Sequence, residues 1–243
     1  MKIDSELLHI IKNFDSNGQI YISGDRNNIK LFQYGNVIIN IKSFRIPGFL
    51  NKIIYATFRK SKAFRSYDFA KKLTFLGIGT PRPIAFFEEI NLFGLGKSYY
   101  ISEHIKFDLM FRDLVEDLNY PEIEEILKQF TAFSFKMHQN GVEFLDHSPG
   151  NTLIVKNLNH YNFYLVDLNR MKFHNTMNFE LRMKNLSRLT PHKQMVKSIS
   201  KYYSILSGED EDMIFQTLWK YTSDFQEHYY RKKRIKKQLL FWK

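Results

Sequence analysis

The chain has 243 residues, of which 44% are hydrophobic and 25% charged, so it can bury the core of one large domain or two small lobes. No stretch approaches the roughly 20 apolar residues of a membrane-spanning helix, and the acid-containing N-terminus does not predict a signal peptide. Because cysteine is absent, disulfides, thiolate catalysis and cysteine-ligated metals are excluded, and a cytoplasmic location is expected.

The net charge of +11 is concentrated at one end of the chain. Residues 231–243 carry seven Lys and Arg and no acid, and subtracting these seven from +11 leaves +4 on the rest. A nucleic-acid-binding surface spreads its charge more widely, so DNA is not expected as a partner. Aromatic and aliphatic residues are mixed with the cations, which predicts either docking on an anionic membrane surface or a solvated helix end.

The first part of the chain is predicted to begin with strands. Residues 21–32 and 37–44 are rich in β-branched and aromatic residues and are separated by the turn residues Gly35–Asn36. We expect a two-stranded hairpin whose second strand ends at Lys42.

A helix is predicted next, over residues 60–76, where apolar residues recur at helical spacing. Residues 83–90 and 97–105 follow as two more strands, so the helix should cover a small sheet. The intervening Gly94–Ser98 resembles the end of a phosphate-binding P-loop, but it leads into a strand where a P-loop opens a helix. We therefore predict a hairpin turn there.

Beyond residue 107 the pattern becomes helical. Helices are predicted over residues 108–118 and 121–139, followed by short strands and then mainly by helix. The order predicts an α+β fold with two lobes, a strand-rich N-lobe over residues 1–104 and a helical C-lobe over residues 105–243.

The strongest chemical signal is the sequence D-H-S-P-G-N from Asp146 to Asn151, followed by Asp167 at the end of an apolar strand. Phosphoryl transfer needs a carboxylate at the acceptor hydroxyl, a carboxylate and an amide that hold Mg²⁺, and a lysine that neutralises the phosphates. Asp146 and Asn151 on one tight loop can point at the acceptor and at the metal, and Asp167 can reach the same metal. The spacing therefore predicts a phosphotransferase.

Four segments together resemble the lipopolysaccharide core kinases, the family of Kdo and heptose kinases: FRKSKAFRSYDFAKKL, GIGTPRPIAFFEE, HQNGVEFLDHSPGNTLIV and YLVDLNRMKF. The resemblance covers residues 24–173. It implies a protein-kinase-like fold, ATP and Mg²⁺ as cofactors, and a sugar hydroxyl of the lipid-linked inner core as acceptor. It also implies a peripheral position at the inner face of the cytoplasmic membrane.

The resemblance assigns roles to individual residues. Asp146 would be the catalytic base, and Asn151 and Asp167 would be the Mg²⁺ ligands. Lys42 would be the strand lysine that binds phosphate, and Asp68 would be its partner on the following helix.

Three departures from the protein-kinase pattern bear on these roles. Phe144–Leu145 replaces the usual His–Arg pair, so control through a phosphorylated activation loop is not expected. The metal-binding triplet is Asp167–Leu168–Asn169, without Phe or Gly. No G-x-G-x-x-G precedes Lys42, and Gly24 with residues 25–28 is predicted as the turn that covers the phosphates.

Two other functions stay open on the sequence alone. One is a different small-molecule or protein kinase of the same fold, since the motif does not choose the acceptor. The other is a pseudokinase that acts as a scaffold at a membrane or on RNA. His147 is predicted either to contact substrate or to be an ordinary polar residue of the loop, and His138 is predicted to be structural.

Overall fold

The computed structural model divides into two compact units, which we describe separately. Unit 1 comprises Met1–Lys106 with Leu165–Arg170, and unit 2 comprises Phe107–Tyr164 with Met171–Lys243. The residues that the structure describes are 4–24, 27–46, 60–91, 94–158 and 160–240.

The short segment Leu165–Arg170 belongs to unit 1, whereas the predicted boundary at residues 104/105 leaves it in the C-lobe. Two hydrogen bonds explain the difference. The Leu165 N–H donates to the carbonyl of Gly79 at 2.9 Å, and the Thr80 hydroxyl donates to the Leu165 carbonyl at 2.9 Å. Asp167 is therefore carried by unit 1.

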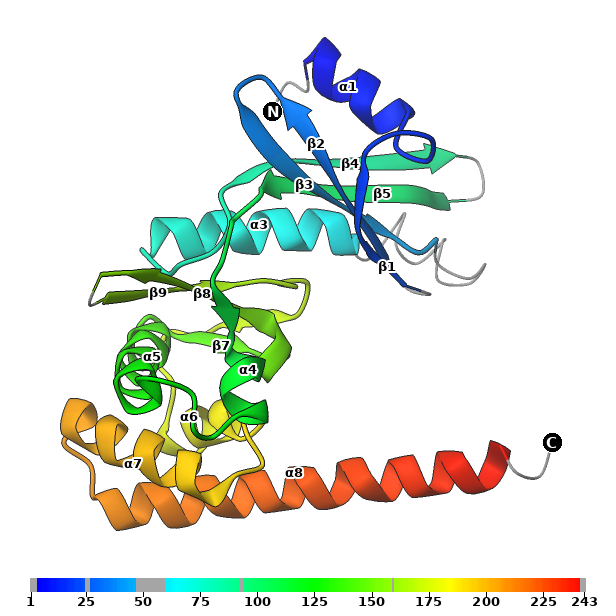
Figure 1. Cartoon of the computed structure of the whole chain (residues 1–243). Helices are drawn as coiled ribbons and strands as arrows, with labels where there is room; N and C mark the ends of the chain where they lie inside the picture. Colours follow the sequence, from blue (N-terminus) through cyan, green and yellow to red (C-terminus); the bar gives the residue numbers. More distant parts are fainter. Residues whose placement is uncertain (1–3, 25–26, 47–59, 92–93, 159, 241–243) are drawn as a thin grey trace. The chain divides into compact units, whose positions relative to one another are not determined.

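Unit 1 is built on a five-stranded antiparallel sheet in the order β1-β2-β3-β5-β4 (Figure 1). The strands are β1 (Gln19–Ser23), β2 (Asn27–Tyr34), β3 (Val37–Phe44), β4 (Pro83–Asn91) and β5 (Gly94–Glu103). The Gly35–Asn36 turn is confirmed, and Lys42 lies two residues before the end of β3.

The structure changes two sequence expectations about these strands. The single strand over residues 21–32 is two strands, because the chain turns after Ser23, where the Gly24 N–H donates to Asn28 Oδ1 at 3.3 Å. The predicted hairpin is confirmed, since β4 and β5 pair antiparallel with Asn91 opposite Gly94, but Gly94–Ser98 is the beginning of β5 rather than the turn itself. No helix starts there, so the P-loop interpretation is excluded.

Two helices cover opposite faces of the sheet (Figure 1). The predicted helix is α3 (Lys62–Phe75), capped by the Ser61 hydroxyl, which accepts from the Phe64 N–H at 2.9 Å. A second helix, α1 (Ser5–Lys12), was not predicted. It buries Leu7 and Ile11 with the β3 residues Ile39 and Ile41 in one apolar cluster.

Strand alternation places Lys42 on the sheet face that α3 covers. Ile39 and Ile41 point to the α1 side, so Lys42 points to the other. Lys42 is paired across the sheet with Tyr100, and Tyr100 with Phe86. The Phe86 ring in turn packs on Phe64 of α3, with centroids 5.1 Å apart.

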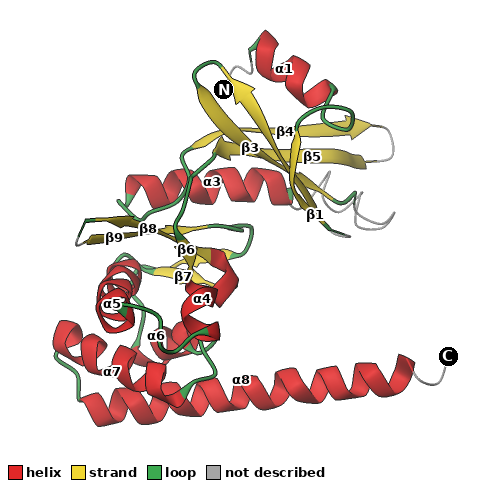
Figure 2. Ribbon diagram, viewed as in Figure 1, coloured by secondary structure: helices red, strands yellow, loops and turns green. Residues whose placement is uncertain are grey.

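Unit 2 is mainly helical, with two small sheets (Figure 2). Its sheets have the orders β6-β8-β9 and β10-β7. The strands are β6 (Leu109–Met110), β7 (Val142–Phe144), β8 (Thr152–Asn157), β9 (His160–Leu165) and β10 (Met171–Phe173). The helices are α4 (Phe111–Glu116), α5 (Ile123–Gln139), α6 (Phe179–Leu186), α7 (Lys193–Ser207) and α8 (Glu211–Leu240), with the short 3₁₀ helix η1 (Pro149–Asn151). Within the described ranges, no helix combines the length and the apolar character needed to cross a bilayer.

The helix predicted over residues 108–118 is shorter, because Leu109 and Met110 pair with β8. The Met110 N–H then donates to the Asp113 carboxylate at 2.8 Å, which caps α4 at its first turn. The helix predicted over residues 121–139 is confirmed as α5.

The core of unit 2 centres on Phe130 of α5, which has no exposed surface. Its ring packs against Phe111 of α4, with centroids 4.3 Å apart, and against Phe163 of β9 at 5.5 Å. It also lies 5.8 Å from the ring of His147, in the D-H-S-P-G-N loop. The loop is therefore packed directly on the core.

We expect Phe130→Ala to lower the free energy of unfolding by about 3–5 kcal/mol, because it removes buried contacts and leaves a cavity. The matched control is Phe75→Ala at a side chain that is 89% exposed, which should change stability by less than about 0.5 kcal/mol. Urea unfolding followed by circular dichroism measures both. Equal losses in the two variants would contradict this description of the core.

Candidate active site

In unit 1, the strand lysine and the aspartate after β9 form an ion pair. Lys42 Nζ lies 2.6 Å from Asp167 Oδ1, across 125 residues of sequence. The Lys42 side chain is 13% exposed and that of Asp167 is 38% exposed. The Asn169 amide donates to the same Oδ1 at 2.6 Å. Among the described residues both bonds end on Oδ1, so Asp167 Oδ2 remains available to a cation.

Asp167 also has an unusual backbone conformation. Its φ is +58°, in the left-handed region that residues other than glycine rarely adopt. Such strain costs on the order of 1 kcal/mol and is typical of functional sites, where surrounding bonds maintain it. Here the bonds from Lys42 and Asn169 do so. Asn169 replaces the glycine of the usual triplet, and it supports the aspartate directly.

The predicted partnership between Lys42 and Asp68 is not formed. Asp68 instead pairs with Lys72, one turn along α3, at 3.2 Å. The aspartate is one methylene shorter than the usual glutamate, and the Asp167 carboxylate already holds the lysine.

Gly24 lies at the turn between β1 and β2, as predicted for the turn that covers the phosphates. Its N–H is already used by Asn28 Oδ1, so it is not a free donor. A Cβ at this position would meet only the Asn27 carbonyl, at 3.6 Å, so space does not require a glycine here. Residues 25–26 lie outside the described residues.

In unit 2, the D-H-S-P-G-N loop is closed by its own hydrogen bonds. The Asn151 side-chain amide donates to the Asp146 carbonyl at 2.8 Å, and the Asn151 N–H donates to the Ser148 carbonyl at 3.0 Å. The amide nitrogen is therefore occupied inside the loop, and the amide oxygen is the atom left to face a cation. This orientation fits the expected role of Asn151 as a metal ligand.

Arg188, which follows α6, supports this loop from outside. Its Nη1 donates to the Leu145 carbonyl at 2.8 Å and lies 3.9 Å from Asp146 Oδ1. Its guanidinium also stacks over the Phe225 ring of α8 at 5.0 Å. Arg188 thus brings to Asp146 the positive charge that the missing His–Arg pair does not supply.

A buried polar network supports the strand before the loop. The Asn185 amide donates to the Phe144 carbonyl at 2.8 Å, and its oxygen lies 3.2 Å from His138 Nε2. His138 Nδ1 lies 2.9 Å from the Tyr203 hydroxyl. Since Asn185 Oδ1 can only accept, Nε2 carries the proton and Nδ1 accepts from Tyr203. The structural role predicted for His138 is confirmed.

His147 is fully buried, so its ring has no surface exposed to a ligand. Its ring lies between Phe130 and Phe144, with centroids 5.8 and 5.7 Å away. Burial lowers the pKa of His147 to about 4 and that of His138 to about 3, from 6.5. Both rings are therefore neutral in the folded chain, and their contribution to stability is lost as the pH falls below about 6.5.

The described residues contain no group of three His, Cys, Asp or Glu that could hold a metal. The predicted Mg²⁺ ligands are one amide and one carboxylate, Asn151 in unit 2 and Asp167 in unit 1, and each has an oxygen available. Mg²⁺ in proteins keeps several waters and takes other ligands from phosphates, so it does not need a cluster of protein carboxylates.

The sequence did not reveal Arg188, Asn185 or Asn169 as site residues. Asn169 could have been found, since a polar residue two positions after Asp167 can bond to its carboxylate. Arg188 and Asn185 act through backbone carbonyls about 40 residues away in sequence, and no local pattern records such contacts.

No protein-family model matches the chain, and no curated protein matches it in sequence. Among solved structures, the chain is similar to WaaP in complex with acyl carrier protein, with a TM-score of 0.63 over 90% of this chain and 92% of that one. The two sequences are 13% identical, so the likeness concerns the fold. It confirms the protein-kinase-like α+β fold that the sequence predicts.

Proposed function

We propose that the chain is an ATP- and Mg²⁺-dependent kinase that phosphorylates a sugar hydroxyl of the lipopolysaccharide inner core. The observation that carries this proposal is the 2.6 Å pair between Lys42 and Asp167. A lysine that binds phosphate and an aspartate that binds Mg²⁺ must converge on one ligand, so they lie close enough to pair with each other.

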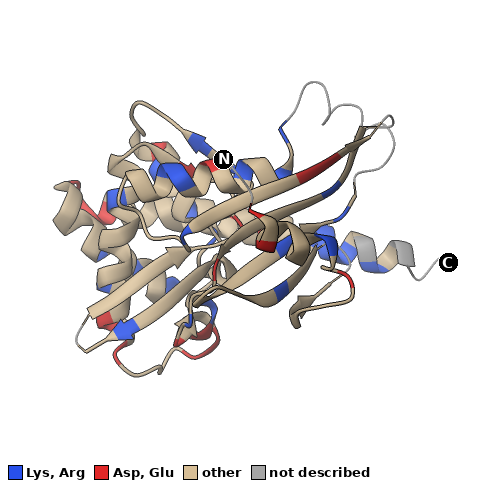
Figure 3. Cartoon of the chain, turned by 90° about the horizontal axis from the view of Figure 1, so that it is seen from above, with Lys and Arg blue, Asp and Glu red and all other residues tan. Residues whose placement is uncertain are grey.

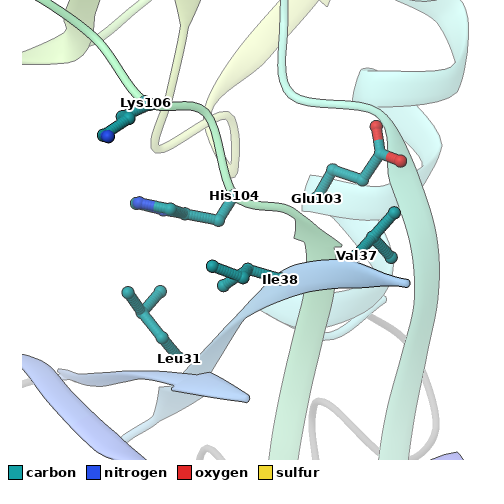
Figure 4. Close-up of a pocket in the computed structure, with 6 residues that line it drawn as sticks. All are labelled: Leu31, Val37, Ile38, Glu103, His104 and Lys106. Atoms are coloured by element: carbon teal, nitrogen blue, oxygen red, sulfur yellow. The ribbon is translucent and has the colours of Figure 1, made fainter. Parts of the chain in front are cut away.

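A cavity in unit 1 supports nucleotide binding (Figure 4). It has a volume of about 390 Å³ and is lined by Leu31, Val37, Ile38, Glu103, His104 and Lys106. Ile38 and Lys42 lie on the same face of β3, about 13 Å apart along the strand. A base held at Ile38 would leave the phosphates to run toward Lys42.

The catalytic roles follow from the two halves of the site. Asp146 would accept the proton of the acceptor hydroxyl, and Lys42 would neutralise the transferred phosphoryl group. Asn151 and Asp167 would hold Mg²⁺, which when bound supplies positive charge against the phosphate oxygens. Catalysis would come mainly from positioning and charge neutralisation.

The acceptor is proposed from similarity to known proteins. The number of solved chains that match this fold is 1169, so the fold alone does not choose a substrate. The segments around Asp146 and Asp167 resemble the lipopolysaccharide core kinases, and the fold is similar to that of WaaP in complex with acyl carrier protein. These two similarities favour a sugar of the inner core over a protein acceptor.

The C-terminal part of α8 supports a position at a membrane surface. The helix continues to Leu240 and carries Arg231, Lys232, Lys233, Arg234 and Lys237. Figure 3 shows Lys and Arg in blue along this end of the helix. Tyr229 and Tyr230 are each 52% exposed beside them. Cations with neighbouring aromatic residues are the composition that binds anionic lipid headgroups. We propose that this end of α8 docks at the inner face of the cytoplasmic membrane, where a lipid-linked acceptor lies.

The central prediction separates two aspartates. Asp146→Asn should lower phosphorylation by about 100- to 10,000-fold while ATP binding survives, because it removes the proton acceptor. Asp167→Asn should instead weaken binding of Mg²⁺-ATP. The matched control is Asp224→Asn, at an exposed position on α8.

Labelled ATP with a lipid extract, followed by mass spectrometry, measures transfer, and calorimetry with and without Mg²⁺ measures nucleotide binding. Full activity in both variants would remove the site assignment. Tight nucleotide binding without transfer by the unaltered chain would favour a pseudokinase.

Arg188 should act on turnover rather than on nucleotide binding. Arg188→Gln should lower kcat by about tenfold and leave KM for ATP unchanged, because its hydrogen bond to Leu145 and its charge beside Asp146 are lost. Arg188→Lys keeps the charge and should restore part of kcat. A merely structural arginine would instead lower stability without this order among the variants, which thermal unfolding would reveal.

Neutralising the basic end of α8 should release the protein from anionic vesicles. With Arg231, Lys232, Lys233 and Arg234 replaced by Gln, sedimentation with phosphatidylcholine–phosphatidylglycerol vesicles should fall by about tenfold or more. Replacing four exposed lysines elsewhere, Lys71, Lys128, Lys201 and Lys220, controls for total charge. Equal losses from the two sets would contradict a specific docking segment.

A further inference from the structure

Arg112, the second residue of α4, lies directly over the D-H-S-P-G-N loop. A Cβ added to Gly150 would be 2.2 Å from Arg112 Nη2 and 3.2 Å from its Cζ. The first distance is shorter than real Cβ contacts and the second is tight, so the guanidinium occupies space that Gly150 leaves open. The glycine between Asp146 and Asn151 thus places a cation against the loop that carries both residues.

The guanidinium of Arg112 has no protein partner among the described residues. An arginine carries five N–H donors and no acceptor, and here none of them meets a carboxylate, a carbonyl or an aromatic face. Arg188, which contacts the same loop, is different. It donates to the Leu145 carbonyl, lies near the Asp146 carboxylate and stacks over the Phe225 ring. Arg112 is exposed and has donors available to a ligand.

Nearby acids do not compensate this charge. Asp108 accepts the Lys156 N–H at 2.7 Å, and Asp113 accepts the Met110 N–H at 2.8 Å. Glu116 is four residues along α4, the usual position of an ion-pair partner, yet no ion pair with Arg112 forms. The guanidinium lies over Gly150 instead, and the residue is exposed.

We propose that Arg112 binds an oxyanion of the acceptor, a phosphate or a carboxylate group next to the hydroxyl that Asp146 activates. The planar guanidinium matches both groups, because each offers two oxygens to a pair of parallel N–H donors. The proposal rests on the proposed function and adds to it that the acceptor is an anionic sugar. Bidentate binding would also fix the orientation of the acceptor on the loop.

The test uses the full chain and measures binding without catalysis. In ¹⁵N-labelled protein, titration with glucose 1-phosphate or glucuronate should shift the Arg112 Nε–Hε signal and the Gly150 amide signal, whereas glucose should not. Arg112→Gln should weaken binding of the anionic sugars by about tenfold, judged from the Gly150 signal. Arg112→Lys should show an intermediate loss, and Lys201→Gln, an exposed cation on α7, should show none.

Several outcomes would overturn the proposal: no saturable shift, equal binding by Arg112→Gln, or an equal effect of glucose. A shift that appears with ADP but not with the sugars would assign Arg112 to the nucleotide and would also overturn it. None of these results depends on phosphorylation. Oxyanion binding by Arg112 can therefore be disproved while the proposed kinase activity stands, and the kinase activity can be disproved while oxyanion binding by Arg112 stands.

Discussion

The ion pair between Lys42 and Asp167 is the constraint on which the site in unit 1 depends. Two opposite charges 2.6 Å apart, largely shielded from water on the lysine side, hold the segment after β9 against the central sheet. The same contact holds Asp167 at φ +58°, a conformation that an isolated aspartate would leave. Without a ligand the two groups neutralise each other; with a nucleotide and its metal, each would exchange its partner for a phosphate or a cation.

The D-H-S-P-G-N loop in unit 2 is held by hydrogen bonds to the backbone before it and by packing on the core. It has no charged pair inside it, and its shape depends on backbone carbonyls that accept from side chains elsewhere. Asn185 holds the Phe144 carbonyl and Arg188 holds that of Leu145, so the two residues before Asp146 are both anchored. His147, after Asp146, is packed into the core. Asp146 therefore lies between fixed neighbours on both sides, which is the preorganisation that a proton acceptor needs.

How much the sequence could predict follows from how local each feature is. The tight D-H-S-P-G-N loop was predictable, because Asp146 and Asn151 are close in sequence and their turn chemistry is local. The direct bond from Lys42 to Asp167 was not predictable. Sequence analysis pairs the lysine with Asp68, because an acid on the following helix is its usual partner in the family that the sequence resembles. The β1–β2 break was missed although residues 23–28 are rich in turn formers, because the apolar alternation continues on both sides. α1 was missed although Asp4 caps it and Leu7 and Ile11 have helical spacing.

The division of the chain distributes the proposed site residues between the two units. Asp167 belongs with Lys42 in unit 1, although the chain of unit 2 flanks it on both sides. Lys42 and Asp167, proposed to bind the phosphates and Mg²⁺, are thus paired in unit 1, whereas Asn151, the second proposed Mg²⁺ ligand, and Asp146, the proposed proton acceptor, belong to unit 2 together with Arg112 and Arg188. The two proposed phosphate- and oxyanion-binding cations are divided in the same way, with Lys42 in unit 1 for the donor phosphates and Arg112 in unit 2 for the acceptor. The two aspartates are therefore expected to fail in different ways, Asp167 in nucleotide binding and Asp146 in transfer.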